Sequence, residues 1–155
     1  MKTLYIVRHA KSSWDHPELG DIDRPLNNRG KKNAPEMGRR LAKRQIKPGI
    51  IMASPAKRAR ATAKMIAPEL GIPSAAIQYN DLLYHGSISD ILQAIRNTDD
   101  SMEDLMIFGH NPGFTTLANF LTGADIYNIP TCGIVAINFP IEYWNEVEKV
   151  KGTLL

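Results

Sequence analysis

The stretch TLYIVRHA, residues 3–10, begins as an apolar run and turns abruptly polar at its end. Its first part, Thr3–Val7, is short, apolar and partly β-branched, which is typical of a buried strand. Two further runs have the same character, Gly49–Ala53 (GIIMA) and Leu105–Phe108 (LMIF). Segments with a helical pattern separate the three runs, so strands should alternate with helices along the chain.

The apolar residues between these runs recur at the spacing of amphipathic helices. We expect helices over Arg29–Gln45, Lys57–Leu70, Ser87–Asn97 and Phe114–Leu121, and a short strand over Ala76–Tyr79. Asn27 or Asn28 is a suitable cap for the first helix. Gly133–Phe139 and Tyr143–Val150 resemble the two strands of a terminal hairpin.

This order of elements predicts a three-layer α/β/α fold, with a mostly parallel sheet covered on both faces and an antiparallel edge from the hairpin. The 155 residues are expected to form one domain. The single cysteine, Cys132, excludes an internal disulfide and suits a reducing compartment. No apolar stretch approaches the roughly 18 residues of a membrane span, and no signal peptide is evident. We therefore expect a cytoplasmic protein.

Two histidines follow strand-like runs directly. His9 comes after the first run and His110 after the run LMIFG. Arg8 precedes His9, and Arg58 would lie in the first turn of the helix that follows the second run. Ligands of open α/β sheets bind outside the carboxyl ends of the strands. These four side chains should therefore converge on one cationic pocket.

Such a pocket suits phosphoryl transfer. Arginine matches phosphate oxygens in a bidentate fashion, and a neutral imidazole is a competent nucleophile towards phosphorus. Attack by His9 would give a phosphoimidazole that water hydrolyses in a second step. The arginines supply the positive charge, so neither a metal nor another cofactor is expected. A metal site built from His9, His110, His85 and Asp15 is disfavoured, because nearby arginines would repel a cation.

Four motifs carry a resemblance to a known family. They are LYIVRHAKS (Leu4–Ser12), RPLNNRG (Arg24–Gly30), SPAKRARATA (Ser54–Ala63) and FGHNPG (Phe108–Gly113). Together they resemble the histidine phosphatase superfamily, which includes phosphoglycerate mutases and acid phosphatases, and most closely its short bacterial phosphohistidine phosphatase branch. The resemblance implies a phosphoglycerate mutase-like fold. It also implies that His9 accepts the phosphoryl group and that Arg8, Arg58 and His110 hold the phosphate. Ser12, just after His9, is a further candidate for binding phosphate.

The chain departs from the family pattern at several positions. Ala10 stands where many members have glycine, and Asp15 where mutases often have asparagine. Tyr84 takes the place of a glutamate that serves as general acid in larger members, which leaves Asp81 as the possible acid. Without a general acid an alkoxide leaves poorly. The departure therefore favours phosphohistidine or another labile phosphoryl group.

The leading hypothesis is a metal-independent phosphatase acting on phosphohistidine in proteins, such as a histidine phosphotransfer-type domain. A small phosphorylated molecule is the alternative substrate, for a phosphomonoesterase or a phosphomutase. A non-enzymatic alternative is a binding module that presents the basic segment Arg29–Lys47 to an acidic partner or RNA. The intact set of pocket residues favours the enzyme, and neither nucleic acid nor membrane is an expected partner. His16 and His85 are expected to be exposed loop residues, with a place at the rim of the pocket as the alternative for either.

Overall fold

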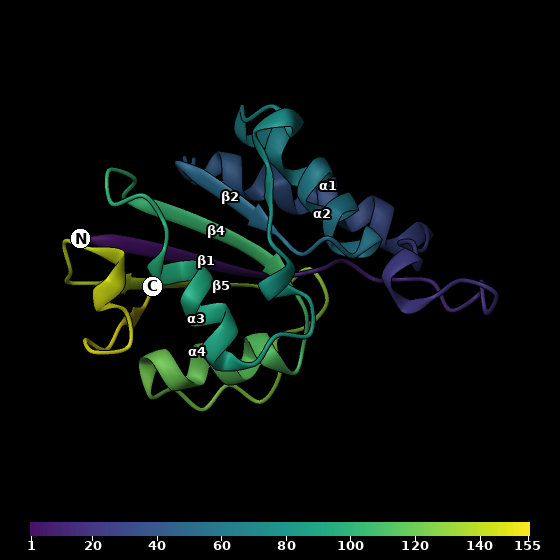
Figure 1. Ribbon diagram of the computed structural model, residues 1–155. Helices are drawn as coiled ribbons and strands as arrows, with labels where there is room; N and C mark the ends of the chain where they lie inside the picture. Colours follow the sequence, from purple (N-terminus) through teal and green to yellow (C-terminus); the bar gives the residue numbers. More distant parts are fainter.

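The first strand of the chain lies inside the sheet, between two strands that come much later in the sequence. The computed structural model describes residues 1–155 and contains one six-stranded sheet in the order β3-β2-β4-β1-β5-β6 (Figure 1). The strands are β1 (Lys2–Arg8), β2 (Ile50–Ala53), β3 (Gln78–Tyr79), β4 (Asp104–Gly109), β5 (Ile134–Phe139) and β6 (Thr153–Leu154). The α-helices are α1 (Asn28–Lys43), α2 (Lys57–Ile66), α3 (Ile88–Arg96) and α4 (Gly113–Thr122).

Strand register brings the two predicted histidines to the same rim. Strands β3, β2, β4 and β1 are parallel, whereas β5 runs antiparallel to β1. In the β1–β4 pair, Arg8 lies opposite Gly109, and the His9 amide donates to the Gly109 carbonyl oxygen at 3.0 Å. The residues that follow these two strands, His9 and His110, therefore leave the sheet side by side.

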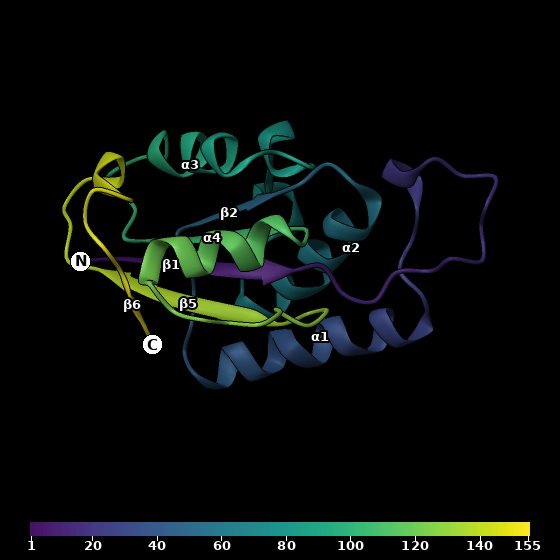
Figure 2. The same cartoon turned by 90° about the horizontal axis from the view of Figure 1, so that it is seen from below.

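Helices cover both faces of the sheet, as expected for a three-layer fold. Helices α1 and α2 lie on one face and α3 and α4 on the other (Figures 1 and 2). Because successive side chains of a strand point to opposite faces, Leu4 and Ile6 join the core beneath α3 and α4. Tyr5 and Val7 join the core beneath α1 and α2. This burial on both sides explains the continuous apolar run of β1. No helix is both long and apolar enough to cross a bilayer.

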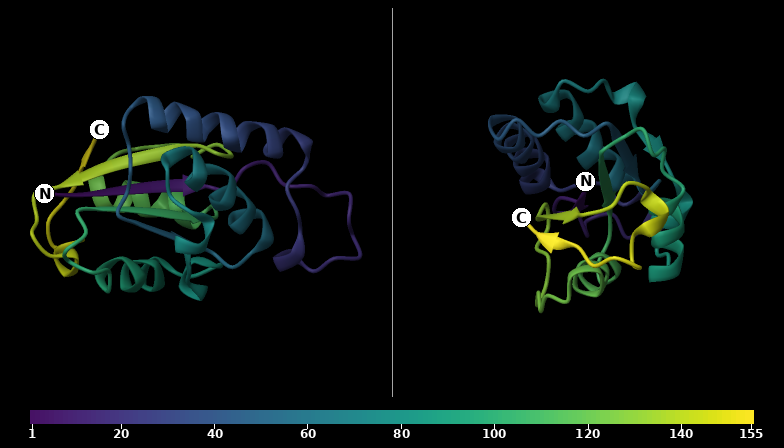
Figure 3. Two further views of the ribbon diagram at one scale, coloured as in Figure 1. Left: turned by 90° about the horizontal axis from the view of Figure 1, so that it is seen from above. Right: turned by 90° about the vertical axis from the view of Figure 1, so that its left-hand side faces the viewer.

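The segment after His9 is anchored at the start of α1. The Asn27 side chain accepts a hydrogen bond from the Gly30 amide at 2.8 Å and so caps the helix. The Asn27 amide donates to the Lys11 carbonyl oxygen at 3.0 Å. A Cβ atom at Gly30 would collide with that same carbonyl oxygen. Residues between these anchors extend past the carboxyl ends of the strands (Figures 2 and 3).

The antiparallel edge is present, but the predicted range of its second strand is wrong. Residues 144–146 form a 3-10 turn, and the strand that pairs with β5 is β6, at 153–154. Trp144 is fully buried, and its indole N–H donates to the Met102 carbonyl oxygen at 2.9 Å. A buried indole needs such an acceptor, which holds this segment away from the sheet edge. The expected helix over Lys57–Leu70 is α-helical only to Ile66 and continues as a 3-10 turn containing Pro68.

Candidate active site

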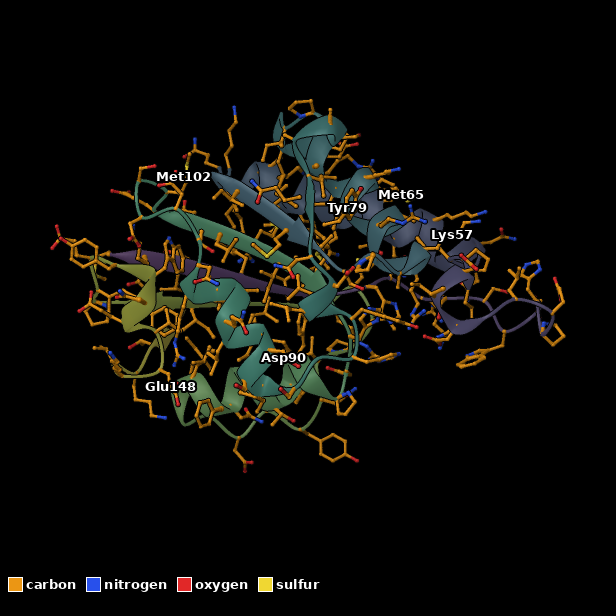
Figure 4. The ribbon with its side chains drawn as sticks, in the orientation of Figure 1. Lys57, Met65, Tyr79, Asp90, Met102 and Glu148 are labelled. Carbon is orange, nitrogen blue, oxygen red and sulfur yellow. The ribbon has the colours of Figure 1, made fainter.

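A cavity of about 260 Å³ opens at the carboxyl ends of the central strands. Arg8, His9, Arg58 and His110, the four residues predicted to converge, all line it. In Figure 4, Lys57 at the start of α2 marks this end of the sheet, and Glu148 lies towards the opposite end. The other residues that line the cavity are Lys11, Ser12, Trp14, Asp21, Arg24, His85, Asn111 and Thr131.

His9 is held in one orientation and one tautomer. Its side chain is buried, and Nδ1 lies 2.7 Å from the Ala10 carbonyl oxygen. A carbonyl oxygen only accepts, so Nδ1 carries the proton and Nε2 keeps its lone pair. Burial, together with the positive charges of Arg58, Arg8 and Arg24, lowers the pKa of His9 to about 4. At neutral pH, His9 therefore presents an unprotonated Nε2, the form required of a nucleophile.

His110 lies beside His9, with a ring-centroid distance of 5.2 Å. Its Nε2 is hydrogen-bonded to the Ser54 hydroxyl at 2.8 Å, whereas its buried Nδ1 has no partner in the protein. Burial and the nearby charge of Arg58 lower the pKa of His110 to about 3. Buried polar atoms are rarely left unpaired. The free nitrogen is therefore available to a bound ligand.

Three arginines supply the positive charge of the cavity. Arg58 is only 2% exposed and donates to the Asp21 carbonyl oxygen at 2.7 Å and to its Oδ2 at 3.0 Å. Arg8 donates to the Ile129 carbonyl oxygen at 2.9 Å. Arg24 donates to the Ser12 hydroxyl. In each of the three, the buried Nε–H has no protein acceptor. A multivalent oxyanion is the kind of ligand that satisfies several such donors at once.

Asp21 is the one carboxylate in the cavity, and the sequence reasoning missed it. Its Oδ2 accepts from the Tyr84 hydroxyl at 2.7 Å and contacts His85 Nε2 at 3.2 Å, in addition to Arg58. Burial alone would raise the pKa of Asp21, but the hydrogen bonds from Tyr84, Arg58 and His85 outweigh it and hold the pKa well below the usual range. Asp21 is therefore ionised at neutral pH.

The structure brings Ser12 into the cavity but leaves Asp81 outside it. Asp81 is exposed and is the first residue of a 3-10 turn, Asp81–Leu83. The buried residue of this turn is Leu83. The expectation of a general acid at Asp81 is thus not supported by its position. His85 is exposed as predicted, with 58% of its side chain accessible, yet it also lines the cavity. The sequence pointed to this loop through Tyr84, which stands where larger family members have their general-acid glutamate, and through His85 as a candidate for the rim of the pocket.

Comparisons with known proteins find similar sequences and similar folds. The family model of the histidine phosphatase superfamily (branch 1) matches residues 4–83. A chloroplastic protein of Arabidopsis thaliana, At3g52155, is 30% identical over 97% of this chain and 72% of its own length. The crystal structure of the putative phosphohistidine phosphatase SixA from Agrobacterium tumefaciens has a TM-score of 0.79 and 29% identity, covering 88% of this chain and 90% of that one.

A second solved structure shares the fold at lower identity. It is the protein histidine phosphatase SixA complexed with tungstate, with a TM-score of 0.82 and 19% identity over 99% of this chain and 94% of that one. The predicted phosphoglycerate mutase-like, three-layer fold is therefore confirmed by these likenesses.

Proposed function

The chain belongs to the histidine phosphatase superfamily, and on that premise we propose that it hydrolyses a phosphoryl group through a phosphohistidine intermediate on His9. We further propose that the substrate is phosphohistidine carried by a protein and that the reaction needs no metal ion. One observation carries the mechanism: a buried histidine with a free Nε2 lies in a cavity lined by Arg8, Arg58 and His110.

The first step transfers the phosphoryl group to the enzyme. His9 Nε2 forms a bond to phosphorus while the bond from phosphorus to the leaving atom breaks, and the leaving atom keeps the electron pair. The guanidinium groups of Arg8 and Arg58, and a ring N–H of His110, would bind the equatorial oxygens, where charge is spread in the transition state. In the second step water attacks phosphorus, and the electron pair of the P–N bond returns to His9.

The ionic state of Asp21 supports a labile substrate. A carboxylic acid that donates a proton to a departing alkoxide must itself be protonated, and Asp21 is held in its ionised form. A phosphoramidate such as phosphohistidine places less demand on a carboxylic acid than an alkyl phosphate does. The likeness to the Agrobacterium tumefaciens structure, described as a putative phosphohistidine phosphatase, supports the same substrate class.

The proposal is tested by measuring phosphate release in the presence of a metal chelator. The substrates are a phosphohistidine-bearing histidine phosphotransfer domain and p-nitrophenyl phosphate, each with wild type, His9→Ala and the control His16→Gln. His16 is a suitable control because it does not line the cavity and pairs with Glu18 at 3.5 Å. We expect wild type and His16→Gln to be equally active and to prefer the phosphoprotein. We expect His9→Ala to be inactive on both substrates.

Each part of the proposal can fail separately in this experiment. Activity retained by His9→Ala would refute the covalent mechanism. A preference for the aryl ester over the phosphoprotein would refute the substrate class and favour a small-molecule phosphatase. Loss of wild-type activity in chelator would refute the metal independence.

A further inference from the structure

A second cavity adjoins the first and shares His85, His110 and Asn111 with it. It has a volume of about 270 Å³ and lies at the N-terminal ends of α3 and α4. Figure 4 labels Asp90, which lies in the first turn of α3. The remaining lining residues are largely apolar or small: Leu83, Gly86, Ser87, Ile88, Ile91, Pro112, Gly113 and Thr116.

His85 stands at the boundary in an unusual backbone conformation. Its φ angle is +53°, in the left-handed region that a non-glycine residue adopts at a cost. A Cβ atom at the next residue, Gly86, would collide with the Leu82 carbonyl oxygen, so the turn is fixed on both sides. Strained residues of this kind cluster at functional sites. In this conformation the His85 side chain lines both cavities.

The contacts of His85 leave one ring nitrogen free. Nε2 contacts the Asp21 carboxylate at 3.2 Å, and the ring lies 4.2 Å from the Tyr84 ring and 5.6 Å from the His110 ring. No protein group is hydrogen-bonded to Nδ1. A carboxylate on one nitrogen orients an imidazole, so that the other nitrogen can exchange a proton.

We propose that His85, held by Asp21, is the general acid and base of the reaction. This proposal rests on the proposed function. In the first step, protonated His85 gives its Nδ1 proton to the leaving group as the bond to phosphorus breaks. When the substrate is phosphohistidine, its histidine side chain keeps the electron pair of the broken P–N bond, takes this proton on the other ring nitrogen and departs as neutral imidazole. In the second step, neutral His85 takes a proton from the attacking water, and phosphate and protonated His85 result.

Other groups at the boundary are less suited to this role. Asp21 is ionised, and burial together with the hydrogen bond to Asp21 raises the pKa of the Tyr84 hydroxyl. The pKa of His110 is about 3, so this residue is already neutral at physiological pH. The charged and titratable groups that face His85 are Asp21, Tyr84 and His110, with Arg58 bound to the far side of the same carboxylate. Histidine is the residue type that ordinarily exchanges protons near neutral pH.

The test compares phenyl phosphate with p-nitrophenyl phosphate in wild type, His85→Gln and His16→Gln. The two esters fill similar space, but phenoxide is the more basic leaving group and needs a proton more. The ratio kcat/KM reports only the steps up to release of the leaving group, so it isolates the first transfer. We expect His85→Gln to lose about 100-fold with phenyl phosphate and little with p-nitrophenyl phosphate, and His16→Gln to match wild type.

The pH profile gives a second readout that a merely structural residue would not change. With phenyl phosphate, the wild-type kcat/KM should show an alkaline limb, as expected of a step that needs a general acid, and this limb should be missing in His85→Gln. Equal losses on both esters, or an unchanged alkaline limb, would overturn the role of His85. That failure is distinct from failure of the proposed function, which would appear as activity in His9→Ala.

Discussion

Protonation of the buried His9 should destabilise the fold below neutral pH, and the size of the effect follows from its environment. The pKa of His9 is about 4 in the folded protein, against about 6.5 in an unfolded chain. Between these values the unfolded state binds more protons, so stability rises with pH. Each pH unit across this window is worth about 1.4 kcal/mol per group. Acidification from pH 7 to pH 4.5 should therefore cost about 2.4 kcal/mol through His9 alone.

The measurement is urea unfolding of wild type, His9→Gln and the control His16→Gln at pH 7 and pH 4.5. Carboxylates also titrate in this range, so the informative quantity is the difference in acid-induced loss between variants. His9→Gln should lose about 2.4 kcal/mol less than wild type, and His16→Gln should behave like wild type. The same loss in all three proteins would show that burial does not keep His9 neutral. The argument for a free Nε2 nucleophile at neutral pH would then fail.

Three further predictions follow from particular contacts. Gly30→Ala should destabilise the protein by about 1–3 kcal/mol in urea unfolding, because its Cβ would meet the Lys11 carbonyl oxygen, whereas Gly20→Ala, with no atom within 4 Å, should not. Trp144→Ala should lower the free energy of unfolding by about 3–5 kcal/mol and lower the Tm, because Trp144 is fully buried. The half-exposed Tyr143 should tolerate alanine, and equal losses in the two variants would contradict the assigned burial. Asp21→Asn should tighten inorganic phosphate binding about tenfold by calorimetry, since it removes a carboxylate that competes for the Arg58 guanidinium; weaker binding would refute this competition.

The elements that carry a strong periodic pattern could be predicted from the sequence. The apolar run of β1 and the order of strands and helices were sufficient to place His9 and His110 on one rim, because parallel strands end at the same edge. The terminal segment was mispredicted because an alternating pattern also fits a turn around a buried tryptophan. Trp144 finds its hydrogen-bond acceptor at Met102, a long-range contact that no local pattern reveals.

The residues of the candidate site also differ in whether local sequence patterns could predict their positions. Residues that directly follow strands, or start the helix after one, could be placed in advance. Asp21 and His85 could not, because loops carry them and their meeting depends on several side-chain contacts at once. The guanidinium of Arg24, for example, lies 3.8 Å from the centre of the Trp14 ring and also contacts the Asp21 carboxylate. Sequence spacing contains no information about such distances.

The position of β1 also affects when the site can form during synthesis. This strand emerges from the ribosome before the other strands, yet its two neighbours are β4, from residue 104, and β5, which ends at residue 139. A nascent chain that ends at residue 100 thus carries His9 and Arg58 but has neither His110 nor any strand to pair with β1. Such long-range pairing delays folding until the late segments are available. The nucleophile should therefore meet its partners only after β4 and β5 have been translated, so nascent chains that lack these strands have no assembled site.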